Sequence, residues 1–307
     1  MADAALRTPE ERFIAAQDYD WAPNYTENLP GFEGLRMHLV DEGPARAGQV
    51  YLCLHGEPTW GFLYRKMMPV FLESKARVVV PDLFGFGRSD KPVDDEVYTW
   101  SFHRDSLIRL IEQRNLKGIT LVCQDWGGLL GLTLPMQMPE RFNRILVMNT
   151  ALGTGDYEMT PGFLAWRQFV RDQPDFDIAQ LMQRACPTLT EDELAAYAAP
   201  FPDARYRAGV RRFPDMVPDH PAADGAELSR QARDWLSNEW SGDTFAAVGA
   251  QDPVLGVQVM ESVASQIRGC PSPLVLEDAG HFAQEAGEAI ARAALIEWGD
   301  LQPEEDS

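Results

Sequence analysis

The sequence is poor in cysteine and histidine and has no long apolar run. Its 307 residues include four cysteines and five histidines, which are scattered and form no Cys-x-x-Cys pair. We therefore expect free thiols and no metal site. No apolar stretch approaches the length needed to cross a membrane, and the first residues lack the basic segment and apolar run of a signal peptide. These absences predict a cytoplasmic protein with no membrane partner.

Positive charge is also scarce. The chain has 27 Lys and Arg against 47 Asp and Glu, a formal net charge of −20, which disfavours nucleic acids and anionic membranes as partners. The negative net charge does not affect the binding of an uncharged substrate. The turn at 81–90 contains Gly-x-Gly but not Gly-x-Gly-x-x-Gly, so a dinucleotide is not expected. We expect the protein to use no cofactor.

Strand-like runs rich in Val, Ile and Leu alternate with helical patterns along most of the chain. This alternation predicts an α/β protein with a mostly parallel, doubly wound sheet. The expected strands are 50–54, 77–81, 119–124, 145–149, 244–249 and 274–276, with 35–41 as an antiparallel edge strand. The expected helices between and after them include 102–112, 128–136, 226–238 and 282–298.

The alternation stops between residues 149 and 244, where the sequence is rich in aromatic residues and proline. Helical spacing recurs there at 164–170, 178–184 and 191–198, and Thr190 is the expected N-cap of the last of these helices. We interpret this region as a helical cap domain, residues 153–225. It is inserted into one core domain, residues 1–152 and 226–307, and the chain is long enough for both.

A carboxylate occupies the most informative position of the sequence. In the run Val122-Cys123-Gln124-Asp125-Trp126-Gly127-Gly128, a predicted strand passes directly into a predicted helix. Cys123 and Gly127 are small enough for a tight turn, as in the Gly-x-Ser-x-Gly nucleophile elbow. The turn presents Asp125 where such an elbow carries serine.

Two further residues follow predicted strands and complete a catalytic set. Asp252 comes after the strand that ends at Gly249, and His281 comes between the last strand and the last helix, so both lie at carboxyl ends of strands, where such sheets bind ligands. The loop that contains Glu57 follows the strand 50–54. The backbone N–H of Glu57, together with that of Trp126, can form an oxyanion hole.

These motifs resemble those of the α/β-hydrolase superfamily and, within it, the haloalkane dehalogenases. The resemblance extends from about residue 35 to residue 298 and is most specific at His55-Gly56-Glu57-Pro58-Thr59-Trp60 and Gln124-Asp125-Trp126-Gly127-Gly128. It implies the α/β-hydrolase fold, with Asp125 as nucleophile, His281 as general base and Asp252 as orienting acid. Other dehalogenases carry a glutamate at position 149, but here the residue is Asn149. The chain therefore resembles the subfamily whose triad acid follows the strand ending at Gly249.

The leaving halide needs hydrogen-bond donors that cannot attack, and an indole N–H only donates. Trp126 is one such donor by its place beside the nucleophile. Some relatives carry a second tryptophan within the segment that here reads 184–190, which has none. Other relatives place it on the first cap helix, where Trp166 lies, and this resemblance implies that Trp166 is the second donor. Apolar residues that could line a substrate pocket, or equally the core, are Phe163, Phe169, Phe213, Pro214, Leu255 and Phe282.

The resemblance implies hydrolysis of a carbon–halogen bond to an alcohol, a halide ion and a proton. The expected partners are a small apolar halogenated substrate, water and the halide, and we expect a monomer. An epoxide hydrolase remains the main alternative, because it can share this triad and needs cap tyrosines as proton donors, for which Tyr157, Tyr197 and Tyr206 are available. A fluoroacetate dehalogenase is disfavoured because it typically has arginine where this chain has Trp126. A relative without catalytic activity is a minor alternative.

Overall fold

An eight-stranded sheet forms the centre of the protein, with the strand order β10-β9-β8-β7-β4-β5-β3-β2. The computed structural model describes residues 5–17 and 19–303. The strands from β10 to β5 in this order are parallel, and β3 is antiparallel to both β5 and β2. Their bounds are β2 Asn24–Thr26, β3 Met37–Glu42, β4 Val50–Leu54, β5 Arg77–Pro81, β7 Ile119–Gln124, β8 Phe142–Met148, β9 Asp243–Gly249 and β10 Leu274–Leu276. A separate ribbon pairs β1 (Ala5–Leu6) with β6 (Lys91–Pro92).

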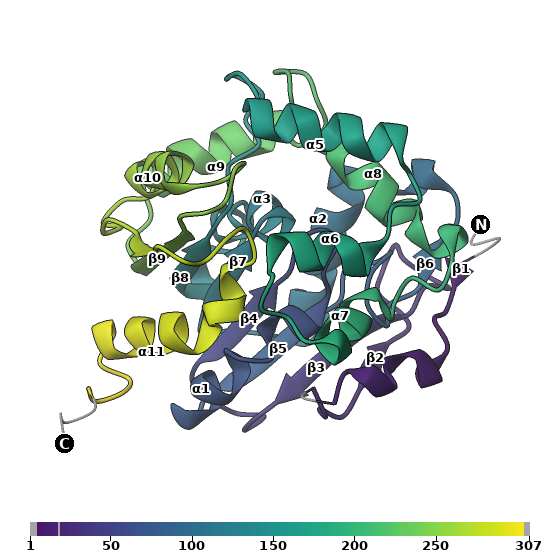
Figure 1. Cartoon of the computed structure of the whole chain (residues 1–307). Coiled ribbons are helices and arrows are strands. Elements are labelled where there is room, and N and C mark those ends of the chain that lie inside the picture. Colours follow the sequence, from purple (N-terminus) through teal and green to yellow (C-terminus); the bar gives the residue numbers. More distant parts are fainter. Residues whose placement is uncertain (1–4, 18, 304–307) are drawn as a thin grey trace.

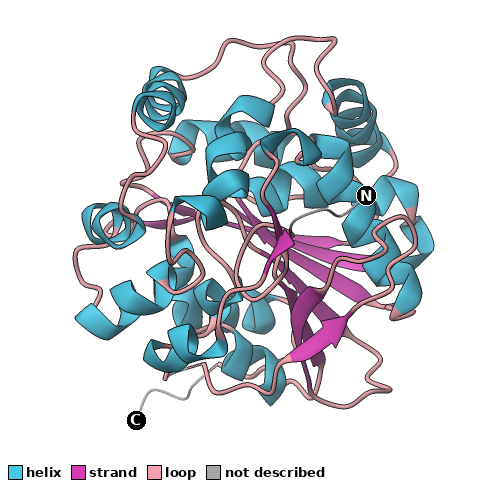
Figure 2. Cartoon of the chain, turned by 90° about the vertical axis from the view of Figure 1, so that its right-hand side faces the viewer, coloured by secondary structure: helices cyan, strands magenta, loops and turns pink. Residues whose placement is uncertain are grey.

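Helices cover both faces of this sheet (Figures 1 and 2). Every residue of β4 and β7 is buried, as expected of parallel strands whose sequences are almost continuously apolar. Helices α1 (Met68–Glu73) and α11 (Gly287–Glu297) pack together on one face, and α2 (Trp100–Gln113), α3 (Trp126–Gly131) and α9 (Ala226–Asn238) lie on the other. The α/β-hydrolase fold with a doubly wound sheet, predicted from the sequence, is confirmed.

The structure corrects some of the predicted elements. Strand β3, expected at the edge of the sheet, is flanked by the three-residue strand β2, which is too short to give a pattern. The helix expected over 128–136 is divided into α3 and α4 (Leu134–Gln137). Pro135 lies in the first turn of α4, and because it has no N–H it cannot continue the hydrogen bonds of α3. The helix expected over 282–298 is a short 3-10 turn, η6 (Ala283–Ala286), followed by α11.

Four helices lie between β8 and α9, in the region where the cap was predicted. They are α5 Pro161–Asp172, α6 Ile178–Ala185, α7 Glu191–Ala198 and α8 Ala208–Met216, and α5, α6 and α8 lie above the sheet in Figure 1. The predicted N-cap of α7 is confirmed, because the Thr190 side chain accepts a hydrogen bond from the backbone of Glu193, whose own side chain completes a capping box. The domain boundaries at 153 and 225 remain a prediction.

A buried arginine links helix α7, in the region predicted as a cap, to the turn η6 that precedes α11. Arg65, only 4% exposed, donates to Glu193 of α7 at 2.6 Å and to Glu285 of η6 at 2.7 Å. Its guanidinium also donates to the hydroxyl of Tyr197 in α7. Helix α7 and the turn η6 are therefore held together by charge. In the part of the chain that the structure describes, no helix is both long enough and apolar enough to cross a membrane.

Candidate active site

Asp125 occupies the turn between β7 and α3, with a φ of 50° and a ψ of −126°. Small residues allow this tight turn. A Cβ atom on Gly127 would lie 1.9 Å from the carbonyl oxygen of Leu54, and one on Gly56 would lie 2.1 Å from Oδ1 of Asp125. The positive φ and the crowded backbone are the features of a nucleophile elbow, and the predicted strand-turn-helix arrangement around Asp125 is confirmed.

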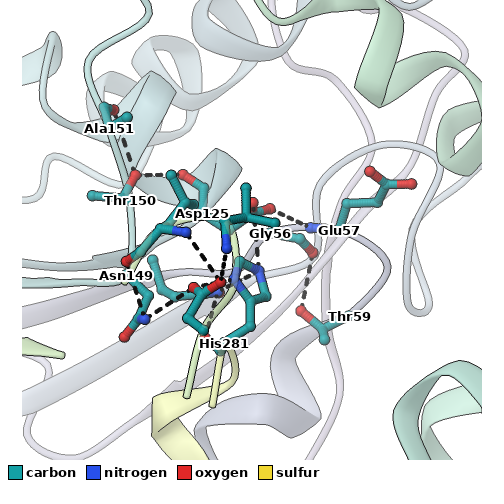
Figure 3. Close-up of polar contacts among 12 residues, drawn as sticks. Gly56, Glu57, Thr59, Asp125, Asn149, Thr150, Ala151 and His281 are labelled. Atoms are coloured by element: carbon teal, nitrogen blue, oxygen red, sulfur yellow. Dashed lines mark hydrogen bonds and ion pairs between the residues drawn. The ribbon is translucent and has the colours of Figure 1, made fainter. Parts of the chain in front are cut away.

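His281 and Asp252 meet Asp125 at the carboxyl ends of the strands (Figure 3). Nδ1 of His281 lies 2.8 Å from Oδ2 of Asp252, and Nε2, on the other side of the ring, lies 3.6 Å from Oδ2 of Asp125. Asp252 is further fixed by the backbone N–H groups of Val254 and Leu255, which donate to its Oδ1. The structure thus brings together the three residues that the sequence predicted as a triad.

The opposite charges within this group favour the ionised form of each member, and burial opposes it. Burial opposes the ionisation of Asp252, but the charge and hydrogen bond of His281 lower its pKa to about 2. Burial likewise disfavours the imidazolium, but Asp252, followed by Asp125, raises the pKa of His281 to about 9. Burial also raises the pKa of Asp125, although His281 and two backbone N–H groups favour its ionised form. Both carboxyl groups thus favour the protonated form of His281, while burial opposes the charge on Asp125.

The two backbone donors are those predicted for the oxyanion hole. The N–H of Glu57 donates to Oδ1 of Asp125 at 2.8 Å, and the N–H of Trp126 also lowers the pKa of Asp125. The loop that carries Glu57 is held by the carbonyl of Gly56, which accepts a hydrogen bond from the hydroxyl of Thr59 at 3.0 Å (Figure 3). One carboxylate oxygen of Asp125 is thus occupied, while the other faces His281.

Two amide side chains support the triad and were given no such role from the sequence. Nδ2 of Asn149 donates to Oδ2 of Asp252 at 3.0 Å, and its Oδ1 accepts from the backbone N–H of Gly249 at 2.9 Å. Nε2 of Gln124 lies 3.0 Å from Nε2 of His281 and donates to its carbonyl at 3.1 Å. Gln124 is the last residue of β7, and Asn149 directly follows β8. This position at the end of a buried strand is the feature of the sequence that could have indicated a supporting role.

Asp125 and His281 line a cavity of about 1030 Å³. Trp126 and Trp166, the two predicted halide donors, line the same cavity. Trp126 is only 2% exposed, whereas Trp166 is half-buried on α5. Four of the six apolar residues predicted for the pocket also line it, namely Phe163, Pro214, Leu255 and Phe282.

Phe169 and Phe213, also predicted for the pocket, do not line the cavity. The ring of Phe213 packs against that of Trp126, with centroids 4.6 Å apart, and against the buried ring of His103 at 4.7 Å. The ring of Phe169 packs against Trp166 at 5.7 Å. Each phenylalanine therefore supports a cavity tryptophan, and helical spacing cannot separate such a supporting residue from a lining residue.

The three tyrosines considered for epoxide opening are dispersed. Tyr157 lines the cavity, but its hydroxyl donates to the carbonyl of Leu152. Tyr197 is fully buried and its hydroxyl is engaged by Arg65 and Glu285. Tyr206 is not among the cavity residues. Thus no pair of these hydroxyls converges on the cavity near Asp125.

No cluster of three or more His, Cys, Asp or Glu side chains that could hold a metal ion occurs within residues 5–17 and 19–303. All four cysteines are free. Burial raises the pKa of the Cys53 thiol well above its usual value and that of Cys270 to about 12. Such thiols have little nucleophilic character.

Comparisons with known proteins identify the family to which the chain belongs. The family model for the alpha/beta hydrolase fold matches residues 50–288. A haloalkane dehalogenase of Psychrobacter cryohalolentis is 40% identical over 294 residues, which cover 94% of this chain and 95% of that protein. The chain belongs to the haloalkane dehalogenase family. A second family member, from Mycolicibacterium paratuberculosis, is 37% identical and covers 95% of this chain and 97% of its own length.

A solved structure of the family has nearly the same fold. Haloalkane dehalogenase DpaA from Paraglaciecola agarilytica NO2 superposes with a TM-score of 0.93 at 48% identity, covering 95% of this chain and 98% of that one. DpaA is described as tetrameric. Our expectation that this haloalkane dehalogenase family member is a monomer therefore finds no support.

Proposed function

We propose that this protein hydrolyses the carbon–halogen bond of small apolar haloalkanes, through an alkyl ester formed on Asp125. The observation that carries the proposal is the position of Asp125. Its carboxylate stands at a nucleophile elbow, faces an imidazole that a second carboxylate holds, and lines a cavity that two tryptophans share. Membership of the haloalkane dehalogenase family supports the same chemistry.

The first step is a displacement at the carbon that bears the halogen. Since the N–H of Glu57 binds Oδ1 of Asp125, Oδ2 is the oxygen that attacks. Its lone pair forms the new carbon–oxygen bond, and the electrons of the carbon–halogen bond leave with the halide. A carboxylate needs no prior deprotonation for this attack. The indole N–H groups of Trp126 and Trp166 then stabilise the halide without offering it an acidic proton.

The second step hydrolyses the ester. Formation of the ester removes the negative charge of Asp125, one of the charges that raise the pKa of His281. The imidazolium therefore loses its proton more readily, and the neutral ring can then take a proton from water. The water oxygen attacks Cγ of Asp125, and the oxyanion that forms on Oδ1 is held by the N–H groups of Glu57 and Trp126.

Collapse of this intermediate completes the reaction. The ester bond to the alkyl group breaks, and the alcohol takes the proton from His281. Asp125 is left as a carboxylic acid whose remaining proton passes to His281, which restores the carboxylate and the imidazolium of the first step. The sum of the steps is a haloalkane and water giving an alcohol, a halide ion and a proton. Asp252 keeps the imidazole oriented and stabilises its cation throughout.

Epoxide hydrolysis is the second candidate, but it is less well supported. An opened epoxide is an alkoxide that requires a proton donor, and of the three tyrosines only Tyr157 lines the cavity, with its hydroxyl engaged by Leu152. The residue after the nucleophile is Trp126, so a charged haloacid finds no cationic side chain at that position. The cytoplasmic location remains a prediction from the sequence.

One set of assays tests the proposed function. Purified protein is incubated separately with 1-bromobutane, 1,2-dibromoethane and styrene oxide, and halide release and diol formation are measured. We expect bromide from both bromoalkanes, and none from the Asp125→Asn variant. Diol from styrene oxide without bromide from either bromoalkane would contradict the proposal and establish the epoxide hydrolase instead.

A further inference from the structure

Gln124 places a buried amide against the ring of His281. It is the last residue of β7, its side chain is 0% exposed, and it is not among the residues that line the cavity. Its Nε2 lies 3.0 Å from Nε2 of His281, whereas Oδ2 of Asp125 lies 3.6 Å from the same ring atom. The amide is thus closer to this nitrogen than the carboxylate oxygen is.

The backbone of His281 determines which end of the amide faces its ring. Nε2 of Gln124 donates to the carbonyl oxygen of His281 at 3.1 Å. A carbonyl oxygen only accepts hydrogen bonds, so the amide nitrogen, and not the amide oxygen, must lie beside it. At the other end of the amide, Oε1 of Gln124 has Nε2 of Gln284 at 3.5 Å. An N–H donor therefore points towards Nε2 of the imidazole.

This contact distinguishes the two protonation states of His281. Nε2 of the ring accepts a hydrogen bond only when it carries no proton. The ring hydrogen is then on Nδ1, which lies 2.8 Å from Oδ2 of Asp252. In the imidazolium both ring nitrogens carry hydrogen, and the N–H of Gln124 would meet a second N–H. The amide therefore favours the neutral ring and acts against the two carboxylates.

We propose that Gln124 is a positioning residue that favours the neutral form of His281, with the lone pair on Nε2, and so sets the pH at which the alkyl ester is hydrolysed. The inference rests on the proposed function. In ester hydrolysis, Nε2 takes a proton from water and later gives it to the alcohol. The amide keeps Nε2 free of a proton before this transfer. Afterwards, repulsion between the two N–H groups favours release of the proton to the alcohol.

Other ionisable groups also act on this ring. The negative charges of Asp252 and Asp125 favour the imidazolium. In the neighbouring turn η6, Glu285 is paired with Arg65 and Lys66. The remaining titratable residues that line the cavity are Glu57, Tyr157, Glu158, Arg184 and Asp278. A substitution at Gln124 leaves all these groups in place, so a changed pH dependence reports on the amide.

The test compares the wild type with Gln124→Met, a side chain of similar length that has no N–H. In a single turnover of 1-bromobutane, bromide release measures ester formation and mass spectrometry measures ester loss, from about pH 5 to about pH 10. Ester formation should change little, because it needs only the carboxylate of Asp125. The pH midpoint of ester loss should rise by about half to one pH unit, as expected for one lost hydrogen bond.

The matched control is Gln251→Met. Gln251 also lines the cavity, but its side chain is exposed and donates to the carbonyl of Glu277. This variant should keep the wild-type midpoint. A Gln124→Met variant that loses the ester more slowly with an unchanged midpoint would have lost only a structural contact, and it would overturn the inference.

A second measurement uses the unchanged protein. In ¹⁵N-labelled wild type at about pH 10, above the His281 pKa of about 9, NMR should detect a coupling across the hydrogen bond between Nε2 of Gln124 and Nε2 of His281. The absence of this coupling would overturn the inference alone. Wild-type protein that neither releases bromide from 1-bromobutane nor forms an ester would overturn the proposed function as well.

Discussion

The imidazole of His281 lies between two carboxylates that differ in their surroundings. Its Nδ1 is 2.8 Å from Oδ2 of Asp252, whose side chain is fully buried, and its Nε2 is 3.6 Å from Oδ2 of Asp125, whose side chain is 16% exposed and faces the cavity. Asp252 is thus buried against the imidazole, whereas Asp125 is accessible from the cavity. This asymmetry allows Asp252 to keep its charge while Asp125 loses its own by forming an ester.

Replacing Asp252 by asparagine should remove the charge that raises the pKa of His281 most. The pKa of His281 should then fall from about 9, and the ring should lose its fixed orientation. By analogy with the loss of a triad acid elsewhere, we expect kcat to fall by about 10²- to 10⁴-fold. Steady-state bromide release measures this effect. Asp278→Asn, which alters an exposed cavity carboxylate, is the control, and an equal loss in both variants would contradict the role of Asp252.

The ion pair also predicts a pH dependence of stability. His281 has a raised pKa in the folded protein, so its contribution is fully present below its unfolded value of about 6.5 and is lost as the pH rises through about 9. Asp252 has a lowered pKa, so its contribution is lost as the pH falls from about 3.8 towards about 2. Thermal unfolding across this pH range should show the alkaline loss in the wild type and a smaller one in His281→Gln. Identical alkaline profiles would contradict the assignment.

The two cavity tryptophans should both contribute to halide binding. A hydrogen bond to a charged group contributes about 1.5–3 kcal/mol, so Trp126→Phe and Trp166→Phe should each weaken bromide binding by about tenfold or more. Trp235 on α9 is a half-buried tryptophan that packs against Trp240, and Trp235→Phe is the matched control. If Trp166→Phe binds bromide as tightly as this control, Trp166 is not the second donor.

Arg65 should contribute strongly to the attachment of the cap. Its removal leaves Glu285, whose side chain is 11% exposed, without its main cationic partner. Breaking a buried ion pair in this way costs about 3–5 kcal/mol, so Arg65→Met should lower the thermal unfolding midpoint clearly. Arg205→Met removes an arginine that is 72% exposed and, within the described residues, pairs with nearby Asp203 alone, and it should have little effect. Equal midpoints for the two variants would contradict the importance of this link.

Local sequence patterns predicted the sheet, most helices and the three residues that meet at the site. The cap helix α7 begins where Thr190 and Glu193 form a capping box, because that signal lies within four residues. Helix α8 was not predicted, since it contains Pro214, a residue that normally ends a helix. Strand β2 was also missed, because its three residues are held by pairing with β3 and not by a pattern of their own.

The supporting contacts of the site were less accessible to sequence reasoning. Asn149 and Asp252 are far apart along the chain, and their hydrogen bond of 3.0 Å depends on how β8 and β9 align. Phe213 was expected to line the pocket, but it packs against the ring of Trp126. The sequence does not show whether a side chain lies between Trp126 and the cavity or behind Trp126. The residue types at the strand ends predict the chemistry, whereas the packing of the cap decides the shape of the cavity.

The ester on Asp125 is the central claim, and mass spectrometry of the His281→Gln variant tests it most directly. This variant keeps the nucleophile and lacks the base, so incubation with 1-bromobutane should release about one bromide per protein. A peptide containing Asp125 should then carry the added mass of one butyl group, and Asp125→Asn/His281→Gln should show no adduct. Bromide release without an adduct on Asp125, or an adduct on another residue, would contradict the account.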